Sequence, residues 1–150
     1  MESHLKFLGH PVHPILVNVP IGSYIGSLIF DLVYLWRGDP LWYEMAFWLM
    51  GIGIIGHVTA AGSGLVDFFA LSKDKTAAAY RTARVHLLIG VVLLAVYLVN
   101  FYLRWSMGIP PHSPSSWPVL LSLTGNGILG VQGWLGGELV YRHGVGVEKH

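Results

Sequence analysis

Four long apolar segments, separated by short polar ones, make up most of this chain. Each apolar segment exceeds the roughly 20 residues that an α-helix needs to cross the hydrocarbon core of a bilayer. Short connections place consecutive helices antiparallel to one another. The pattern therefore predicts an all-α protein, a transmembrane up-and-down four-helix bundle, formed by a single domain of residues 1–150. The predicted spans are about 14–36, 42–69, 82–104 and 117–141.

Composition narrows the chemistry that such a membrane protein could perform. Hydrophobic residues make up 53% of the chain and charged residues 11%, whereas an average soluble protein is about 25% charged. The formal net charge of +1, without a basic stripe, gives no indication of nucleic-acid binding. No cysteine is present, which excludes disulfides, thiolate-bound zinc, iron–sulfur clusters and covalently attached c-type haem. A metal would need histidine, carboxylate or other nitrogen and oxygen ligands.

Basic residues are concentrated in the second connection and near the two ends of the chain. The first and third connections carry only Arg37 and Arg104. By the positive-inside rule, both termini and the second connection are expected to be cytoplasmic. The basic residues on that side are Lys6, Lys73, Lys75, Arg81, Arg84, Arg142 and Lys149.

Two histidine–proline pairs mark the entry to the first span. Proline fixes its own φ angle and disfavours a helical conformation in the residue before it, so His10 and His13 are expected to be extended. Pro14 suits the first turn of a helix, and Pro20 is expected to kink the span. The segment 9–14 is therefore predicted to be a rigid entry that presents two imidazoles at the edge of the bilayer.

The predicted topology gathers ionisable residues from all four spans at the cytoplasmic end. Odd-numbered spans begin there and even-numbered spans end there, so residues far apart in the chain fall into one layer. Histidine binds metals and haem iron through a neutral ring nitrogen. This layer is therefore the candidate site. It contains His10, His13, Asp67, His86, Glu138 and His143.

The leading interpretation is a b-type haem whose iron is bound by His13 and His86 from facing helices. The glycines of the last span would form a flat slot for the porphyrin. Arginines at the same interface would pair with the haem propionates. Those arginines are Arg81, Arg84 and Arg142.

Three other interpretations remain open for the histidine layer. One is a non-haem metal site in which Asp67 and Glu138 supplement the histidines or orient them, or a proton or quinone site made of the same residues. Another is a structural or accessory subunit in which the histidines cap helices and Glu138 pairs with Arg142. A small transporter is disfavoured because the chain has no internal repeat or pair of broken helices. No catalytic motif is present, so an electron carrier or accessory subunit is favoured over an enzyme.

Two polar positions inside the spans are expected to have partners within the bundle. Helix rise places His57 about 15 Å from the cytoplasmic layer, so it is expected to hydrogen-bond locally rather than join the site. Ser23, Tyr24 and Tyr97 lie at a similar depth, and the alternative is a second haem shared with another copy of His57. Asp31 is expected to pair with Arg104, which would relieve the cost of burying either charge alone.

The two ends of the chain resemble the signature motifs of a known family. The opening HPVHPILV (residues 10–17) and the closing GWLGGELVYRHGVGV (residues 133–147) resemble those of a bacterial family of small four-span integral membrane proteins, grouped as a domain of unknown function. The family pattern has a histidine near the start of the third span, matched by His86, and an acidic residue ending the second, matched by Asp67. Relatives of this kind are sometimes joined to Rieske-type iron–sulfur domains. The resemblance therefore implies a redox setting in a bacterial inner membrane, and a Rieske-type or cytochrome protein is the expected redox partner. A homo-oligomer or a larger membrane complex is a further expectation.

Overall fold

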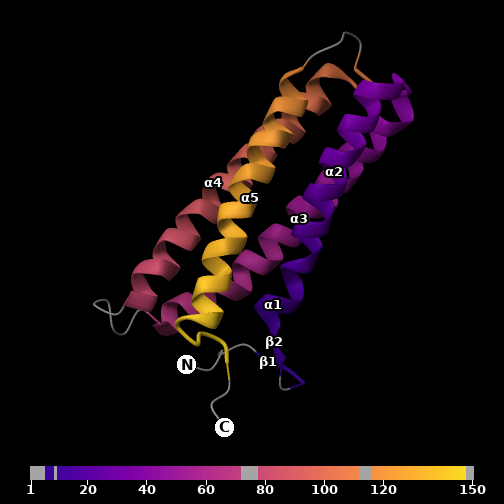
Figure 1. The fold of residues 1–150 in the computed structure, drawn as a ribbon. Helices are drawn as coiled ribbons and strands as arrows, with labels where there is room; N and C mark the ends of the chain where they lie inside the picture. The colour runs from indigo at the N-terminus through magenta and orange to yellow at the C-terminus, as the bar shows by residue number, and fades with distance from the viewer. Residues whose placement is uncertain (1–5, 9, 72–77, 112–115, 148–150) are drawn as a thin grey trace.

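Long antiparallel helices dominate the fold (Figure 1). The computed structural model describes residues 6–8, 10–71, 78–111 and 116–147. Two short strands, β1 (Lys6–Phe7) and β2 (His10–Pro11), pair antiparallel ahead of the first helix. The helices are α1 (Val12–Leu16), α2 (Asn18–Arg37), α3 (Pro40–Leu71), α4 (Ala78–Met107) and α5 (Trp117–Tyr141).

The bundle has two ends of different chemistry. We call the end at which α1 begins and α5 finishes the histidine end, because His13, His86 and His143 lie there. We call the opposite end, where α2 turns into α3, the arginine end, because it contains Arg104. Of the basic residues used to predict the orientation, Lys73, Lys75 and Lys149 lie outside the described residues.

Three helical segments are long and apolar enough to cross a membrane: Val12–Arg37, Pro40–Phe69 and Ala78–Met107. The all-α class is confirmed, and the first three predicted spans fall inside these segments. The fourth predicted span coincides with α5, which is not among the three segments that are apolar enough to cross a membrane. Its hydropathy is lower because Asn126 and Gln132 interrupt the apolar sequence.

The entry to the first span is partly as expected. His10 is extended, in β2, but the expectation of an extended His13 is wrong, because α1 begins at Val12. Pro14 falls in the first turn, where a helix needs no N–H donor. The helix is then interrupted at Val17. Pro20 causes this, since it has no N–H for the carbonyl of the fourth residue before it and its ring crowds that carbonyl.

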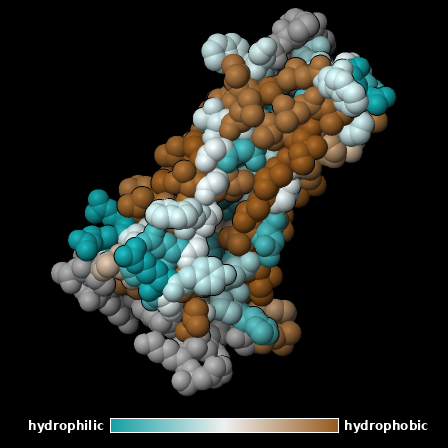
Figure 2. Space-filling model, viewed as in Figure 1, coloured by the Kyte–Doolittle hydropathy of each residue, from teal (hydrophilic) through white to brown (hydrophobic). Residues whose placement is uncertain are grey.

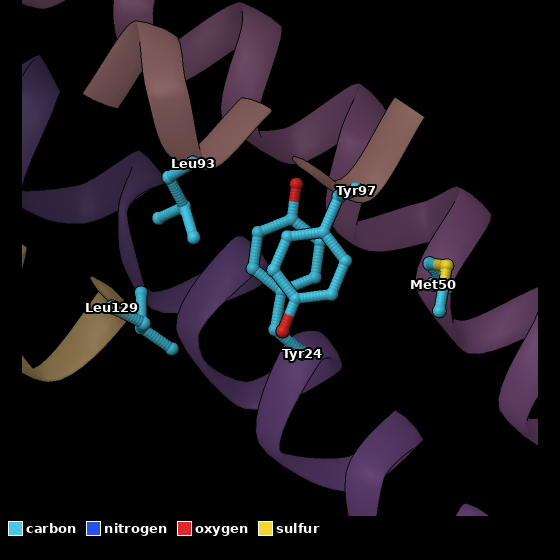
Figure 3. Close-up of a cluster of buried hydrophobic side chains, with 5 residues drawn as sticks. All are labelled: Tyr24, Met50, Leu93, Tyr97 and Leu129. Atoms are coloured by element: carbon cyan, nitrogen blue, oxygen red, sulfur yellow. The ribbon is translucent and has the colours of Figure 1, made fainter. Parts of the chain in front are cut away.

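A pair of stacked tyrosines lies at the centre of the bundle (Figure 3). The rings of Tyr24 from α2 and Tyr97 from α4 are parallel within 3°, with centroids 3.5 Å apart. Each ring also lies against a glycine: a Cβ atom at Gly53 would be 2.6 Å from Tyr24, and one at Gly125 would be 2.8 Å from Tyr97. Four helices therefore meet at this level. Met50, Leu93 and Leu129 complete the cluster.

A polar network occupies the core at the arginine end. Arg104 Nη2 donates to Asp31 Oδ2 at 2.6 Å, and neither side chain has any exposed surface. The predicted Asp31–Arg104 pair is therefore confirmed. Ser122 Oγ donates to the same carboxylate oxygen at 2.7 Å, and Arg104 Nε donates to Asn100 Oδ1 at 3.1 Å. The guanidinium lies 4.9 Å from the centre of the Tyr43 ring, so all four long helices contribute to the network.

The outer surface of the bundle is largely apolar. Figure 2 shows hydrophobic residues over much of the visible face and hydrophilic ones gathered towards the histidine end. Large hydrophobic side chains are exposed on every long helix, among them Ile25, Ile55, Val91 and Leu123. A surface of this kind is suited to lipid contact.

The ring–glycine contacts predict opposite effects for two neighbouring glycines of α5. Gly125→Ala is expected to destabilise the bundle by about 1–3 kcal/mol, because the new methyl group overlaps the Tyr97 ring. Gly127→Ala is the matched control, since nothing lies within 4 Å of a Cβ atom there; it should be neutral or stabilise the helix by up to about 1 kcal/mol. Unfolding of each purified variant in mild detergent measures the difference, and equal stabilities would contradict the packing.

The buried ion pair predicts non-additive mutations. Asp31→Leu or Arg104→Met alone should each destabilise the protein by about 3–5 kcal/mol, because each leaves an uncompensated buried charge. The double variant should recover much of that loss, since no charge then remains at the site. A double-mutant cycle of unfolding free energies in detergent checks this. Additive losses would mean that the two side chains do not interact.

Candidate functional site

Two of the predicted ligands face each other near the histidine end. The imidazoles of His13 in α1 and His86 in α4 have ring centroids 6.4 Å apart and planes inclined by 81°. Both residues are half-buried. The predicted pairing of these two histidines is thus present in the geometry, although 73 positions separate them along the chain.

A contact with α3 selects the tautomer of the His13 ring. Its Nδ1 lies 2.8 Å from the carbonyl oxygen of Ala60. Because a carbonyl only accepts, Nδ1 carries the proton, and a neutral ring keeps the Nε2 lone pair free. Ser63 Oγ is 3.4 Å from the same nitrogen. Gly64 permits this contact, since a Cβ atom there would lie 2.9 Å from the His13 ring.

His86 is contacted by two residues of α5. The side-chain amide of Gln132 donates to His86 Nε2 at 3.1 Å, while a Cβ atom at Gly136 would lie 3.4 Å from Cε1 of the ring. The other ring nitrogen, Nδ1, is buried and has no hydrogen-bond partner within the described part of the chain. Gln132 was not predicted as a site residue, because a neutral amide carries no spacing signal in the sequence.

His57 belongs to the same region, contrary to expectation. Its Nδ1 is hydrogen-bonded to the Tyr24 hydroxyl at 3.3 Å, as predicted for a buried histidine. The expected separation of about 15 Å from the whole layer does not hold for His13, whose ring approaches α3 close to His57. The reason is that the His13 side chain reaches α3 at Ala60, only about 4.5 Å of helix rise from His57.

The remaining predicted histidines are not part of this pair. His10 is exposed in β2. His143 is half-buried and its Nε2 lies 3.4 Å from Thr82 Oγ1 at the start of α4. His143 therefore connects the end of α5 to α4, one turn before His86.

The predicted carboxylates and arginines surround the histidine end. Glu138 accepts a hydrogen bond from Arg142 at 2.7 Å, one turn apart on α5, which confirms the pairing considered for an accessory subunit. Asp67 is half-buried near the end of α3. Arg81 and Arg84 are exposed in the first turns of α4. Within the described residues, no group of three or more His, Asp or Glu side chains could hold one metal ion.

The glycines of α5, expected to form a slot for the porphyrin, include both exposed and packed positions. Nothing lies within 4 Å of a Cβ atom built at Gly127, Gly130 or Gly133, and all three are exposed. By contrast, Gly125 of the same helix is buried against Tyr97. Gly136 is the glycine of α5 that lies against His86.

Comparison with protein families identifies the chain. The model of the family described as "Predicted membrane protein (DUF2231)" matches residues 9–149. The chain belongs to this family. The resemblance of its two end motifs is thereby confirmed, and the protein is a membrane protein that associates with the lipid bilayer. No curated protein and no solved structure matches the chain.

The contact between His13 and Ala60 predicts the tautomer of this histidine. Nitrogen NMR of ¹⁵N-histidine-labelled protein in detergent should show the proton of neutral His13 on Nδ1, because the Ala60 carbonyl cannot donate. His10 is the internal control, since its exposed ring should give the tautomer mixture of a free imidazole. A proton on Nε2 of His13 would contradict the observed contact.

Proposed function

We propose that the protein is a membrane-embedded electron-transfer protein, or a subunit of a redox complex, in which His13 and His86 bind a b-type haem. The observation that carries this proposal is the facing pair of imidazoles. Metal–nitrogen bonds of about 2 Å would place two imidazoles on opposite sides of one metal ion with centroids roughly 6 Å apart. The separation of the His13 and His86 rings is 6.4 Å.

The donor atoms support this assignment. A metal-binding histidine commonly donates its second N–H to a backbone carbonyl, which fixes the ring, and His13 donates in this way to Ala60. On the other side, Nδ1 of His86 is buried without a partner among the described residues. Because Gln132 donates to Nε2, a neutral His86 carries its proton on Nδ1. Iron binding through Nδ1 would move this proton to Nε2, where the Gln132 Oε1 atom, which has no partner among the described residues, would accept it after the amide turns.

A bound haem would supply reversible one-electron chemistry at its iron. The protein's own residues would orient the two imidazoles and limit the access of water. Gly64 and Gly136 contribute by letting helix backbones approach the two rings. Arg81 and Arg84 are the exposed cations available for propionates at this end, whereas Arg142 is already paired with Glu138.

The proposal includes the four-span topology, with α5 as the fourth span. This helix runs beside α4 for most of its length (Figure 1). Its exposed side chains include Leu120, Leu123, Val131 and Trp134, which suit contact with lipid. By the positive-inside rule the histidine end would face the cytoplasm of a bacterial inner membrane, with both termini on that side. A Rieske-type or cytochrome protein would be the redox partner.

A second candidate function, an accessory membrane subunit without a cofactor, is favoured by one observation. Gly127, Gly130 and Gly133 form an open, small-residue face on α5. Such faces let membrane helices approach each other closely. This surface would fit a helix of a larger complex or of a second copy of the chain.

An absorbance spectrum tests the haem proposal. Protein expressed with ample haem and purified in mild detergent should show a Soret band and, after dithionite reduction, a sharp α band of low-spin haem. His13→Ala and His86→Ala should abolish that spectrum, because each removes one iron ligand. His10→Ala and His143→Ala are matched controls and should retain it. A colourless wild-type protein, or unchanged spectra of the first two variants, would contradict the proposal.

A further inference from the structure

Polar side chains form a column through the bundle interior from one end to the other. At the histidine end it contains His86, Gln132 and His13. Deeper in the bundle lies His57, about one turn of α3 from Ala60, which the His13 ring contacts. At the arginine end it contains the Asp31–Arg104 network. Ionisable groups at bilayer depth are costly and commonly mark proton or ion pathways.

Hydrogen bonds around Asn126 join the arginine end to the centre of the bundle. The Asn126 side-chain amide donates to the Tyr97 hydroxyl at 2.9 Å and to the carbonyl oxygen of Ser122 at 3.0 Å. Ser122 itself bonds to Asp31. On the other side of the centre, the Tyr24 hydroxyl is bonded to His57. Polar contacts therefore approach the tyrosine stack from both ends.

Some buried polar atoms of the column have no hydrogen-bond partner among the described residues. Within the described residues, five buried side-chain nitrogen or oxygen atoms have no hydrogen-bond partner, and all five lie at its two ends. Buried polar groups nearly always bond to protein or to water. The arginine end, where three of these atoms lie, and the surroundings of Gln132 are therefore suited to hold water, whereas His86 Nδ1 is the nitrogen proposed above to bind iron. The five atoms are His86 Nδ1, Gln132 Oε1, Asp31 Oδ1, Tyr43 Oη and Arg104 Nη1.

The tyrosine stack separates the two polar halves. The Tyr24 and Tyr97 rings overlap with their hydroxyl groups at opposite ends of the stack (Figure 3). Gly53 and Gly125 hold the rings closely. A proton that crosses the bundle would have to pass this aromatic layer.

We propose that this column is a proton path across the membrane and that the Tyr24–Tyr97 stack is its limiting step. At His57, a proton arriving at one ring nitrogen forms an N–H bond while the N–H bond at the other nitrogen breaks, so the ring ends neutral. No oxidant, reductant or haem is needed for this transfer. The path goes beyond the proposed electron-transfer function, and its central residues, His57 and Tyr24, are not haem ligands in that proposal.

Proton flux into liposomes tests the path. The full chain is reconstituted into liposomes that contain the pH indicator pyranine, and a potassium diffusion potential is imposed with valinomycin. Wild-type protein should acidify the lumen several-fold faster than occurs in protein-free liposomes. Tyr24→Phe, which keeps the ring stack and removes the bond to His57, should lower the flux by about tenfold or more. His57→Leu should do the same.

Matched variants and a leak measurement complete the experiment. His10→Leu replaces an exposed histidine outside the column and should leave the flux unchanged. An entrapped dye should stay inside the liposomes, because the path carries protons and not larger solutes. Flux equal to that of protein-free liposomes, dye release that matches the proton flux, or unchanged flux in a folded Tyr24→Phe variant would overturn the proposal. The haem spectrum is independent of these outcomes, so failure of either proposal is recognised separately.

Discussion

The buried ion pair between Asp31 and Arg104 is the interaction on which the arrangement of the helices depends most. Lipid is as apolar as the side chains that face it, so burial of apolar surface between membrane helices supplies little driving force. An ion pair with no exposed surface is different, because separating the helices would leave both charges in hydrocarbon. Ser122 and Asn100 add hydrogen bonds to the same pair. This network therefore determines which faces of α2, α4 and α5 meet.

Glycine determines the close contacts at the other levels of the bundle. Aromatic and imidazole rings lie directly against glycines of neighbouring helices: Tyr24 against Gly53, His13 against Gly64, Tyr97 against Gly125 and His86 against Gly136. At Gly53, Gly64 and Gly125 a Cβ atom would lie within 3 Å of the ring, so these three contacts require glycine and restrict the register of the helices, whereas a Cβ atom at Gly136 would lie 3.4 Å from His86. The packing that gives the bundle its shape thus also positions the imidazoles of the candidate site.

Hydropathy predicts the long helices of this chain closely because a membrane span is defined by length and apolarity, and both are read directly from the sequence. The Asp31–Arg104 pair was also predictable, since two opposite charges at one depth have few other ways to be compensated. Asn100, Ser122 and Gln132 were not, because neutral polar side chains have no periodicity that reveals a partner. His57 was misplaced for a geometric reason. The depth of His57 was counted along straight helices. In the structure the helix is interrupted at Val17, between α1 and α2, and the His13 ring contacts Ala60 of α3.

The position of His57 also connects the two proposed functions physically. It lies about one turn of α3 from Ala60, which the His13 ring contacts, and is bonded to Tyr24 at the centre of the column. In a low-dielectric interior, a unit change of charge at the histidine pair acts strongly on ionisable groups nearby. An electron arriving there would attract a proton, and His57 is the next ionisable residue of the column, bonded to Tyr24. Electron transfer at the histidine end would therefore draw protons through the column, whereas the column needs no electron to conduct them.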